Sequence, residues 1–272
     1  MLLMPPRLRY PKRIMTPSGS FLVRNEIDVG TVMGIQSRGI YNNLKLRKSD
    51  TVLDCGANIG SFTGYASRLS KKVIAVEPDD SNFEYLMKNI TENGYGNIMP
   101  LKYALSDFDG EGYLTGTNDV TQLSSIPTKR NVSVRRIDTL LSELKITKVD
   151  AMKVDVEGQE ARLLRGQQFL ANVREIIIET HGRENFLDCY DILETNGFEI
   201  VTVGAIRKFL NHLKNVRQLG VEYILLSWRT GFMDLKVYAN LIPSTFRFFG
   251  EGRQDRSLRE IQILYAVKGD SK

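Results

Sequence analysis

The sequence predicts an α/β domain: a doubly wound, mostly parallel sheet of about seven strands with an antiparallel edge strand. From residue 51 onward, short β-branched runs alternate with stretches of helical spacing, the order expected of βαβ units. These runs are apolar almost throughout, as in strands covered on both faces. The chain has 272 residues, 42% hydrophobic and 25% charged, which is the composition of a globular protein with one sizeable core.

The expected elements follow one another in chain order. A short strand at 21–24 and a helix at 28–46 precede the core fold. Core strands are expected at 51–54, 73–77, 98–103, 151–156, 175–179 and 198–203. Helices are expected between them at 61–69, 80–93, 138–144, 160–166 and 188–196. The last strand, at 261–267, is expected to close the sheet as the antiparallel edge strand.

Two insertions interrupt this alternation. Residues 112–134 contain short polar and β-like pieces, which we interpret as an extra hairpin or lid over a crevice. Residues 207–259 are rich in aromatic and basic side chains. A lid or a homo-oligomer contact is the interpretation we favour for them, with an anionic lipid, a glycan phosphate or nucleic acid as alternatives. The expected organisation is an arm, strand and helix at 1–48, followed by one domain at 49–272.

Charge and composition restrict the cellular setting. The formal charge of +5 favours acidic partners only mildly, so nucleic acid is permitted but not indicated. Cys55 and Cys189 have no metal-ligand spacing and indicate neither a disulfide framework nor a zinc site. No apolar run approaches the roughly 18 residues of a membrane span. Residues 1–13 form a basic, proline-interrupted arm without the pattern of a signal peptide, so we expect a cytoplasmic protein.

The loop after the first core strand has the features of a nucleotide site. The strand ends at Asp54, and the loop continues through Gly56, Asn58 and Gly60, all expected to contact a cofactor. The glycines allow a sharp turn and a close approach of the backbone. The G-x-G-x-x-G spacing of a dinucleotide site is missing. An acid at Asp54 would repel a pyrophosphate but would suit the cationic amino-acid portion of S-adenosylmethionine.

Two further acids extend this expected cofactor site. Glu77 and Pro78 end the second core strand, where a carboxylate accepts hydrogen bonds from both ribose hydroxyls of a bound nucleotide. Asp107 follows the third strand, where it is expected to accept a hydrogen bond from the adenine amino group.

Three linked segments carry a resemblance to a known family. They are DCGANIGSF at 54–62, IAVEPD at 74–79 and KVDVEGQE at 153–160. In their order and separation the chain resembles the FkbM-type S-adenosylmethionine-dependent methyltransferases over residues 49–181. The resemblance implies a Rossmann-like class I methyltransferase fold and methyl transfer, usually to a hydroxyl oxygen of a sugar, glycan, lipid or other small molecule. RNA methylation and a non-catalytic nucleotide-binding protein are the alternatives.

The residues that act on the methyl acceptor are expected at the carboxyl ends of the fourth and fifth core strands. Asp155 is the first candidate for a residue at the acceptor and Glu157 the second, since both lie on the same strand face as Lys153. His181, together with Glu179, follows the neighbouring strand and is a chemically reasonable general base.

A metal ion is the alternative to a direct base. Asp155, Glu179 and His181 are the candidate ligands of one divalent cation such as Mg²⁺. Glu160 is expected only to cap the helix that it begins.

Overall fold

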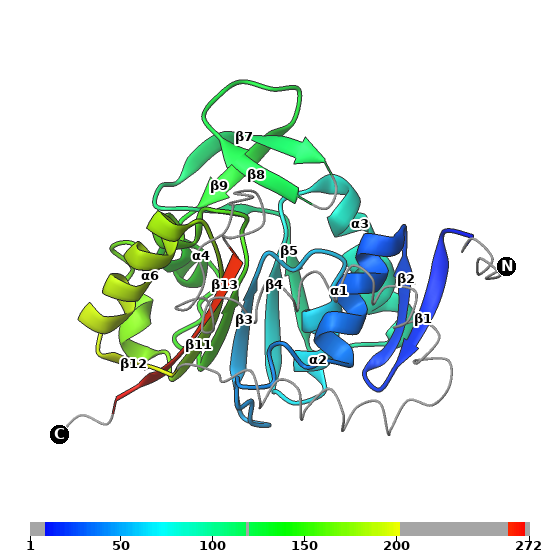
Figure 1. Cartoon of the computed structure of the whole chain (residues 1–272), viewed down its shortest axis with the longest axis horizontal. Helices are drawn as coiled ribbons and strands as arrows, with labels where there is room; N and C mark the ends of the chain where they lie inside the picture. The colour runs from blue at the N-terminus through cyan, green and yellow to red at the C-terminus, as the bar shows by residue number, and fades with distance from the viewer. Residues whose placement is uncertain (1–8, 118–119, 202–260, 270–272) are drawn as a thin grey trace, which may run out of the picture.

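The core of the molecule is a seven-stranded sheet whose strand order identifies a doubly wound fold. The computed structural model describes residues 9–117, 120–201 and 261–269, so the predicted insertion at 207–259 lies outside the described residues. The strand order is β12-β13-β11-β10-β3-β4-β5 (Figure 1). The strands are β3 (Thr51–Cys55), β4 (Lys72–Val76), β5 (Ile98–Leu101), β10 (Ala151–Val154), β11 (Glu175–His181), β12 (Phe198–Ile200) and β13 (Ile261–Lys268).

Helices cover both faces of this sheet, as the apolar runs predict (Figure 1). They are α1 (Glu26–Gln36), α2 (Ser61–Ser67), α3 (Asp80–Asn93), α4 (Ile137–Glu143), α5 (Glu160–Leu164) and α6 (Arg183–Thr195), with a 3₁₀ helix at Gln168–Asn172. Successive residues of β3 point to opposite sides: Val52 packs with Phe62 of α2, while Leu53 belongs to the cluster that contains Leu140 of α4. The core therefore consists of two apolar layers separated by the sheet.

The last strand is antiparallel, as predicted, but it is not at the edge. β13 pairs with β11 on one side and with β12 on the other, both antiparallel. The short strand β12 therefore forms this edge of the sheet. The expected placement was wrong because sequence periodicity shows that a strand is buried on its faces but not which strands flank it.

A second sheet lies over the carboxyl ends of the core strands (Figure 1). It contains β6 (Ala104–Leu105), β7 (Gly110–Thr117), β8 (Val120–Ser124) and β9 (Asn131–Arg135), in the order β6-β9-β7-β8. The predicted extra hairpin at 112–134 is thus confirmed as part of a four-stranded sheet. The strand predicted at 98–103 ends two residues early, at Leu101 of β5, and the chain enters the second sheet at Ala104, where β6 begins.

The N-terminal segment differs from its prediction in two ways. β1 (Lys12–Thr16) and β2 (Gly19–Val23) form an antiparallel hairpin, so the end of the predicted extended arm is a strand. The helix predicted at 28–46 ends ten residues early. The chain turns at Gly39, whose φ is 63°, and Tyr41 then inserts into the core separately from the helix. The apolar spacing beyond residue 36 comes from this irregular but buried segment.

The predicted helix at 188–196 also has a different start. α6 begins at Arg183, directly after Gly182, whose φ of 93° ends β11. Its first turns are largely exposed and give no apolar stripe for a sequence pattern to detect. Within the described ranges, none of the helices combines the length and apolarity needed to cross a bilayer.

Candidate active site

A cavity lies at the carboxyl ends of the core strands, between their loops and the second sheet. The core-sheet loops contribute Gly56, Asn58, Glu77, Pro78, Asp155 and Glu157 to its lining, and the second sheet contributes Leu114, Thr121 and Leu123. The other predicted site residues do not line it; they are Asp54, Gly60, Asp107, Glu179 and His181. The expected cofactor loop and the expected reacting acids therefore meet in one place.

The glycines of the first loop are required by packing within the chain. Gly56 has a φ of 77°, and a Cβ there would lie 1.8 Å from the backbone oxygen of Asp155. Gly60 has a φ of 90°, and its Cβ would lie 2.7 Å from the Leu86 side chain. The positive φ values confirm the expected sharp turn, and packing within the chain is an additional reason for both glycines. Gly56 keeps the two loops in backbone contact.

Glu77 lines the cavity with a buried carboxylate. Oε2 accepts a hydrogen bond of 2.8 Å from the backbone N–H of Asn58, and Oε1 accepts one of 3.0 Å from that of Asp79. Burial raises the pKa of Glu77 to about 7, although these hydrogen bonds oppose the shift. A carboxylate held in this way still has lone pairs for hydroxyl groups of a ligand.

Asp54 lies behind the cavity wall and is fully buried. Its Oδ2 accepts a 2.6 Å hydrogen bond from the Thr63 hydroxyl, and its Oδ1 is 3.4 Å from Nζ of Lys153. Burial raises the pKa of Asp54, while the Lys153 charge opposes that shift. The carboxylate of Asp54 thus belongs to a buried ion pair. Contrary to the expectation from the sequence, it does not line the cavity.

Lys153 connects the two loops. Its ammonium donates a 2.6 Å hydrogen bond to the carbonyl oxygen of Gly56 and lies 3.6 Å from Oδ2 of Asp155. Burial alone would lower its pKa, but the charges of Asp54 and Asp155 outweigh burial and raise it. Lys153 is therefore a permanent cation between the first loop and Asp155.

Tyr41 reaches the same cluster from the segment after α1. Its hydroxyl donates to Oε2 of Glu179 at 2.9 Å and lies 3.4 Å from Oδ2 of Asp155. Burial and the nearby Asp155 charge raise the pKa of Glu179 to about 7, against the opposing effect of the Tyr41 hydrogen bond. Glu179 is thus engaged with Tyr41.

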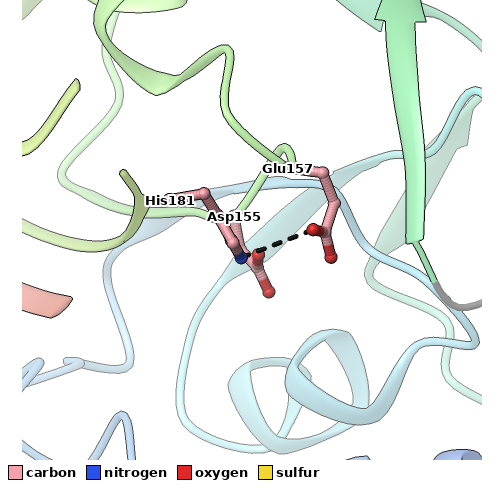
Figure 2. Close-up of side chains that lie close together, drawn as sticks. All are labelled: Asp155, Glu157 and His181. Atoms are coloured by element: carbon pink, nitrogen blue, oxygen red, sulfur yellow. Dashed lines mark ion pairs between the residues drawn. The ribbon is translucent and has the colours of Figure 1, made fainter. Parts of the chain in front are cut away.

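Asp155, Glu157 and His181 form the group expected at the reacting end (Figure 2). Among the described residues they are the set whose ligand atoms come within 4.8 Å of one another. The predicted metal set contained Glu179, whereas here Glu157 accompanies Asp155 and His181. Glu157 has a φ of 53°, and its Oε2 is 3.4 Å from Nε2 of His181. This left-handed turn brings its carboxylate to the cavity.

Glu160 fixes the orientation of the His181 ring. Its Oε1 is 2.9 Å from Nδ1 of His181 and accepts a 3.0 Å hydrogen bond from the backbone N–H of Gly158. Burial would lower the pKa of His181, but the Glu160 hydrogen bond and the charges of Glu157 and Glu160 raise it to about 9. Burial raises the pKa of Glu157 to about 7, against the charge of His181. Glu160 therefore does more than the helix capping expected of it.

A family model, described as the methyltransferase FkbM domain, matches residues 54–218. The chain belongs to the FkbM methyltransferase family. The match begins at Asp54 and includes both the loop expected to bind a cofactor and the acids expected to act on the acceptor.

Two relatives and one solved structure are also named as methyltransferases. Hexuronic acid methyltransferase AglP of Haloferax volcanii is 29% identical over 138 residues, which are 49% of this chain and 57% of that protein. The chain thus spans little more than half the length of that relative. The 31-O-demethyl-FK506 methyltransferase FkbM of Streptomyces tacrolimicus is 24% identical over 60% of this chain and 77% of its own length. A solved methyltransferase FkbM from Methylobacillus flagellatus has 18% identity and a TM-score of 0.44, covering 66% of this chain and 51% of its own.

The FkbM-family domain also contains site residues that sequence reasoning missed. Tyr41 gave no signal, because its segment was predicted as a helix. Lys153 was expected to share a strand face with Asp155 and Glu157, but β10 ends at Val154 and both acids lie in the loop after it. The pairing of Lys153 with Asp54 was not expected. Asp107, expected at adenine, instead pairs with Arg162 on α5, with 2.9 Å between Oδ1 and Nη2.

Proposed function

We propose that this chain is an S-adenosylmethionine-dependent methyltransferase that methylates a hydroxyl oxygen of a glycan, lipid or other small molecule. The observation that carries the proposal is the shared cavity, since Glu77 and Asn58 line it together with Asp155 and Glu157. Family membership supports the same reaction. The acceptor class is supported by relatives that are named for such compounds.

The residues at the cavity fit this cofactor. Glu77 offers a buried carboxylate to ribose hydroxyls, and Asp155 and Glu157 add negative charge near the site proposed for the sulfonium. Three carboxylates would repel the pyrophosphate of a dinucleotide. When bound, S-adenosylmethionine supplies an electrophilic methyl group, so the chain has to orient the acceptor and remove its proton.

Asp155 is the residue that we assign to the acceptor proton. Lys153 and Tyr41 both contact its Oδ2 and stabilise the carboxylate in one orientation. Its other oxygen, Oδ1, is therefore assigned to the acceptor hydroxyl. Glu157, which has His181 as its counter-charge, is assigned to orienting the acceptor.

Calorimetry with S-adenosylmethionine, S-adenosylhomocysteine and NAD tests the cofactor. We expect binding of the first two and none of NAD. The acceptor is then sought by incubating the protein with radiolabelled cofactor and fractions of glycans, lipids and RNA. Micromolar NAD binding without S-adenosylmethionine binding would contradict the cofactor, and labelling confined to RNA would contradict the acceptor class.

An asparagine variant tests the base. Asp155→Asn should retain cofactor affinity and reduce turnover by roughly 100-fold or more, the effect of losing a general base or a metal ligand. Asp191→Asn, an exposed acid on α6, is the matched control. Activity that survives a chelator indicates direct proton transfer, whereas loss and recovery with Mg²⁺ indicate an ion at Asp155. Full turnover by Asp155→Asn would contradict both versions.

A further inference from the structure

We propose that Thr121 and Gln159 recognise the adenine base of the cofactor, and that the second sheet therefore forms one wall of a base-specific subsite. This inference rests on the proposed function and adds to it the residues that read the base.

Two polar atoms at the cavity have no partner within the described part of the chain. They are Oγ1 of Thr121 and Oε1 of Gln159, both buried and both on residues that line the cavity. A buried polar atom without a hydrogen bond is costly, and such atoms are uncommon in folded proteins. A ligand in this cavity that offers hydrogen-bonding groups to both atoms would satisfy them.

Thr121 lies on the inward face of the second sheet. On β8 it is two residues before Leu123, so both side chains point to the same side. Thr121 is paired with Gly116 on the neighbouring strand β7. Gly116 has no side chain that could fill the adjoining space or form a hydrogen bond with the Thr121 hydroxyl. Leu123 is opposite Leu114, which packs with Val134 in an apolar layer. Thr121 thus adds one hydroxyl to an apolar wall.

Gln159 lines the same cavity from the loop after β10 of the core sheet. It directly precedes α5, and α5 is tied to the loop after β6 by the ion pair of Arg162 with Asp107. Tyr103 and Leu105, which follow β5, line the same cavity.

The chemistry of this subsite matches adenine. The base has two flat apolar faces, which suit Tyr103, Leu105 and Leu114, and a polar edge with an amino group and ring nitrogens. Oε1 of Gln159 accepts from the amino group, and the Thr121 hydroxyl donates to a ring nitrogen. Asp107, whose carboxylate is taken by Arg162, is replaced in this role.

The second sheet is also anchored beside Glu77, the residue proposed to bind the ribose. The Arg130 side chain donates to the carbonyl oxygen of Gly116 at 2.7 Å and forms an ion pair with Asp79. Asp79 caps α3 and follows Glu77 by two residues. β7, which pairs with β8 and so positions Thr121, is therefore fixed to the loop that carries Glu77.

The experiment measures binding of S-adenosylhomocysteine and of S-inosylhomocysteine, in which a carbonyl replaces the amino group. Calorimetry on the full chain should show that the unmodified protein prefers the adenosyl ligand at least about tenfold, since a site built for one hydrogen-bonding group rejects an analogue that lacks it. Gln159→Leu should weaken adenosyl binding about tenfold and reduce the preference below about threefold. Thr121→Val should weaken binding of both ligands.

Matched controls separate these effects from general damage. Gln122→Leu changes an exposed residue on the opposite face of β8 and should bind within about twofold of the unmodified protein. Thr121→Ser retains the hydroxyl, so it should bind both ligands more tightly than Thr121→Val. The ratio of the two affinities does not depend on the folded fraction of a preparation. If the unmodified protein binds neither ligand, the proposed function fails. If it binds and the Gln159→Leu and Thr121→Val variants match it in affinity and preference, only this inference is overturned.

Discussion

The charge of Glu160 is predicted to keep His181 protonated. The carboxylate is fully buried, 2.9 Å from Nδ1 of a ring whose side chain is only 18% exposed. Glu160→Gln keeps the shape and the oxygen that accepts from the backbone, but removes the charge. We therefore expect the pKa of His181 to fall from about 9 to below about 8.

The magnitude follows from proton linkage. Each tenfold gain in proton affinity is worth about 1.4 kcal/mol, so a pKa raised from 6.5 to about 9 corresponds to roughly 3 kcal/mol. Glu160 is the leading cause that raises it, so its share is roughly 1.5–2 kcal/mol. Because the folded-state pKa is raised, this stabilisation is complete below pH 6.5 and is lost as the pH rises through about 9.

Two measurements check this prediction. NMR titration of the imidazole protons gives the pKa directly, and the sequence has two histidines, so His181→Gln assigns the resonance. Urea unfolding should show the largest deficit of Glu160→Gln near pH 6.5 and little or none near pH 9.5. Glu184→Gln, an exposed acid on α6, is the control. An ordinary histidine pKa in the unmodified protein, or an unchanged one in Glu160→Gln, would refute the reasoning.

Three further predictions concern the first loop and its neighbours. Lys153→Met should lower the free energy of unfolding by about 3–5 kcal/mol, because it leaves Asp54 as an unpaired buried charge. Adding Asp54→Asn should recover part of this loss, and a single variant as stable as the original in urea would contradict the pairing. Gly56→Ala should destabilise by more than about 3 kcal/mol, because its Cβ would meet a backbone oxygen, whereas Gly94→Ala, with nothing within 4 Å, should cost about 1 kcal/mol. Similar unfolding curves for the two alanine variants would show that the loop can move. Glu77→Gln should weaken S-adenosylhomocysteine binding about tenfold or more through loss of charge-assisted hydrogen bonds, and calorimetry showing an unchanged Kd would exclude the ribose contact.

The alternation of apolar runs predicted the sheet because its central strands are buried on both faces. The spacing of apolar residues gave a wrong prediction at 37–46, where a helix was expected. Tyr41 and Leu44 are instead buried individually in an irregular segment. The place of β13 was not predictable, since strand order depends on pairing across residues distant in the sequence. Local patterns therefore identified most core elements but not their lateral neighbours.

The candidate site was predictable where it depends on strand ends. Asp155 and Glu157 follow one parallel strand and His181 ends the next, so these residues were expected at one edge of the sheet. The partners that tune them were not predictable. Tyr41 is 114 residues from Asp155 in sequence, and nothing local marks it as more than a core aromatic. Lys153, a cation in an apolar strand, was the one visible sign of a buried ionic network.

The backbone contact between Gly56 and Asp155 has a consequence for the divergence of the family. The N–H of Asp155 also donates to the carbonyl oxygen of Cys55 at 3.1 Å, so main-chain atoms set the distance between the cofactor loop and the proposed base. Side chains that face an acceptor do not take part in this contact. Changes in such side chains therefore need not move the proposed base relative to the proposed methyl donor. Such a separation is consistent with relatives named for acceptors as different as a hexuronic acid and 31-O-demethyl-FK506.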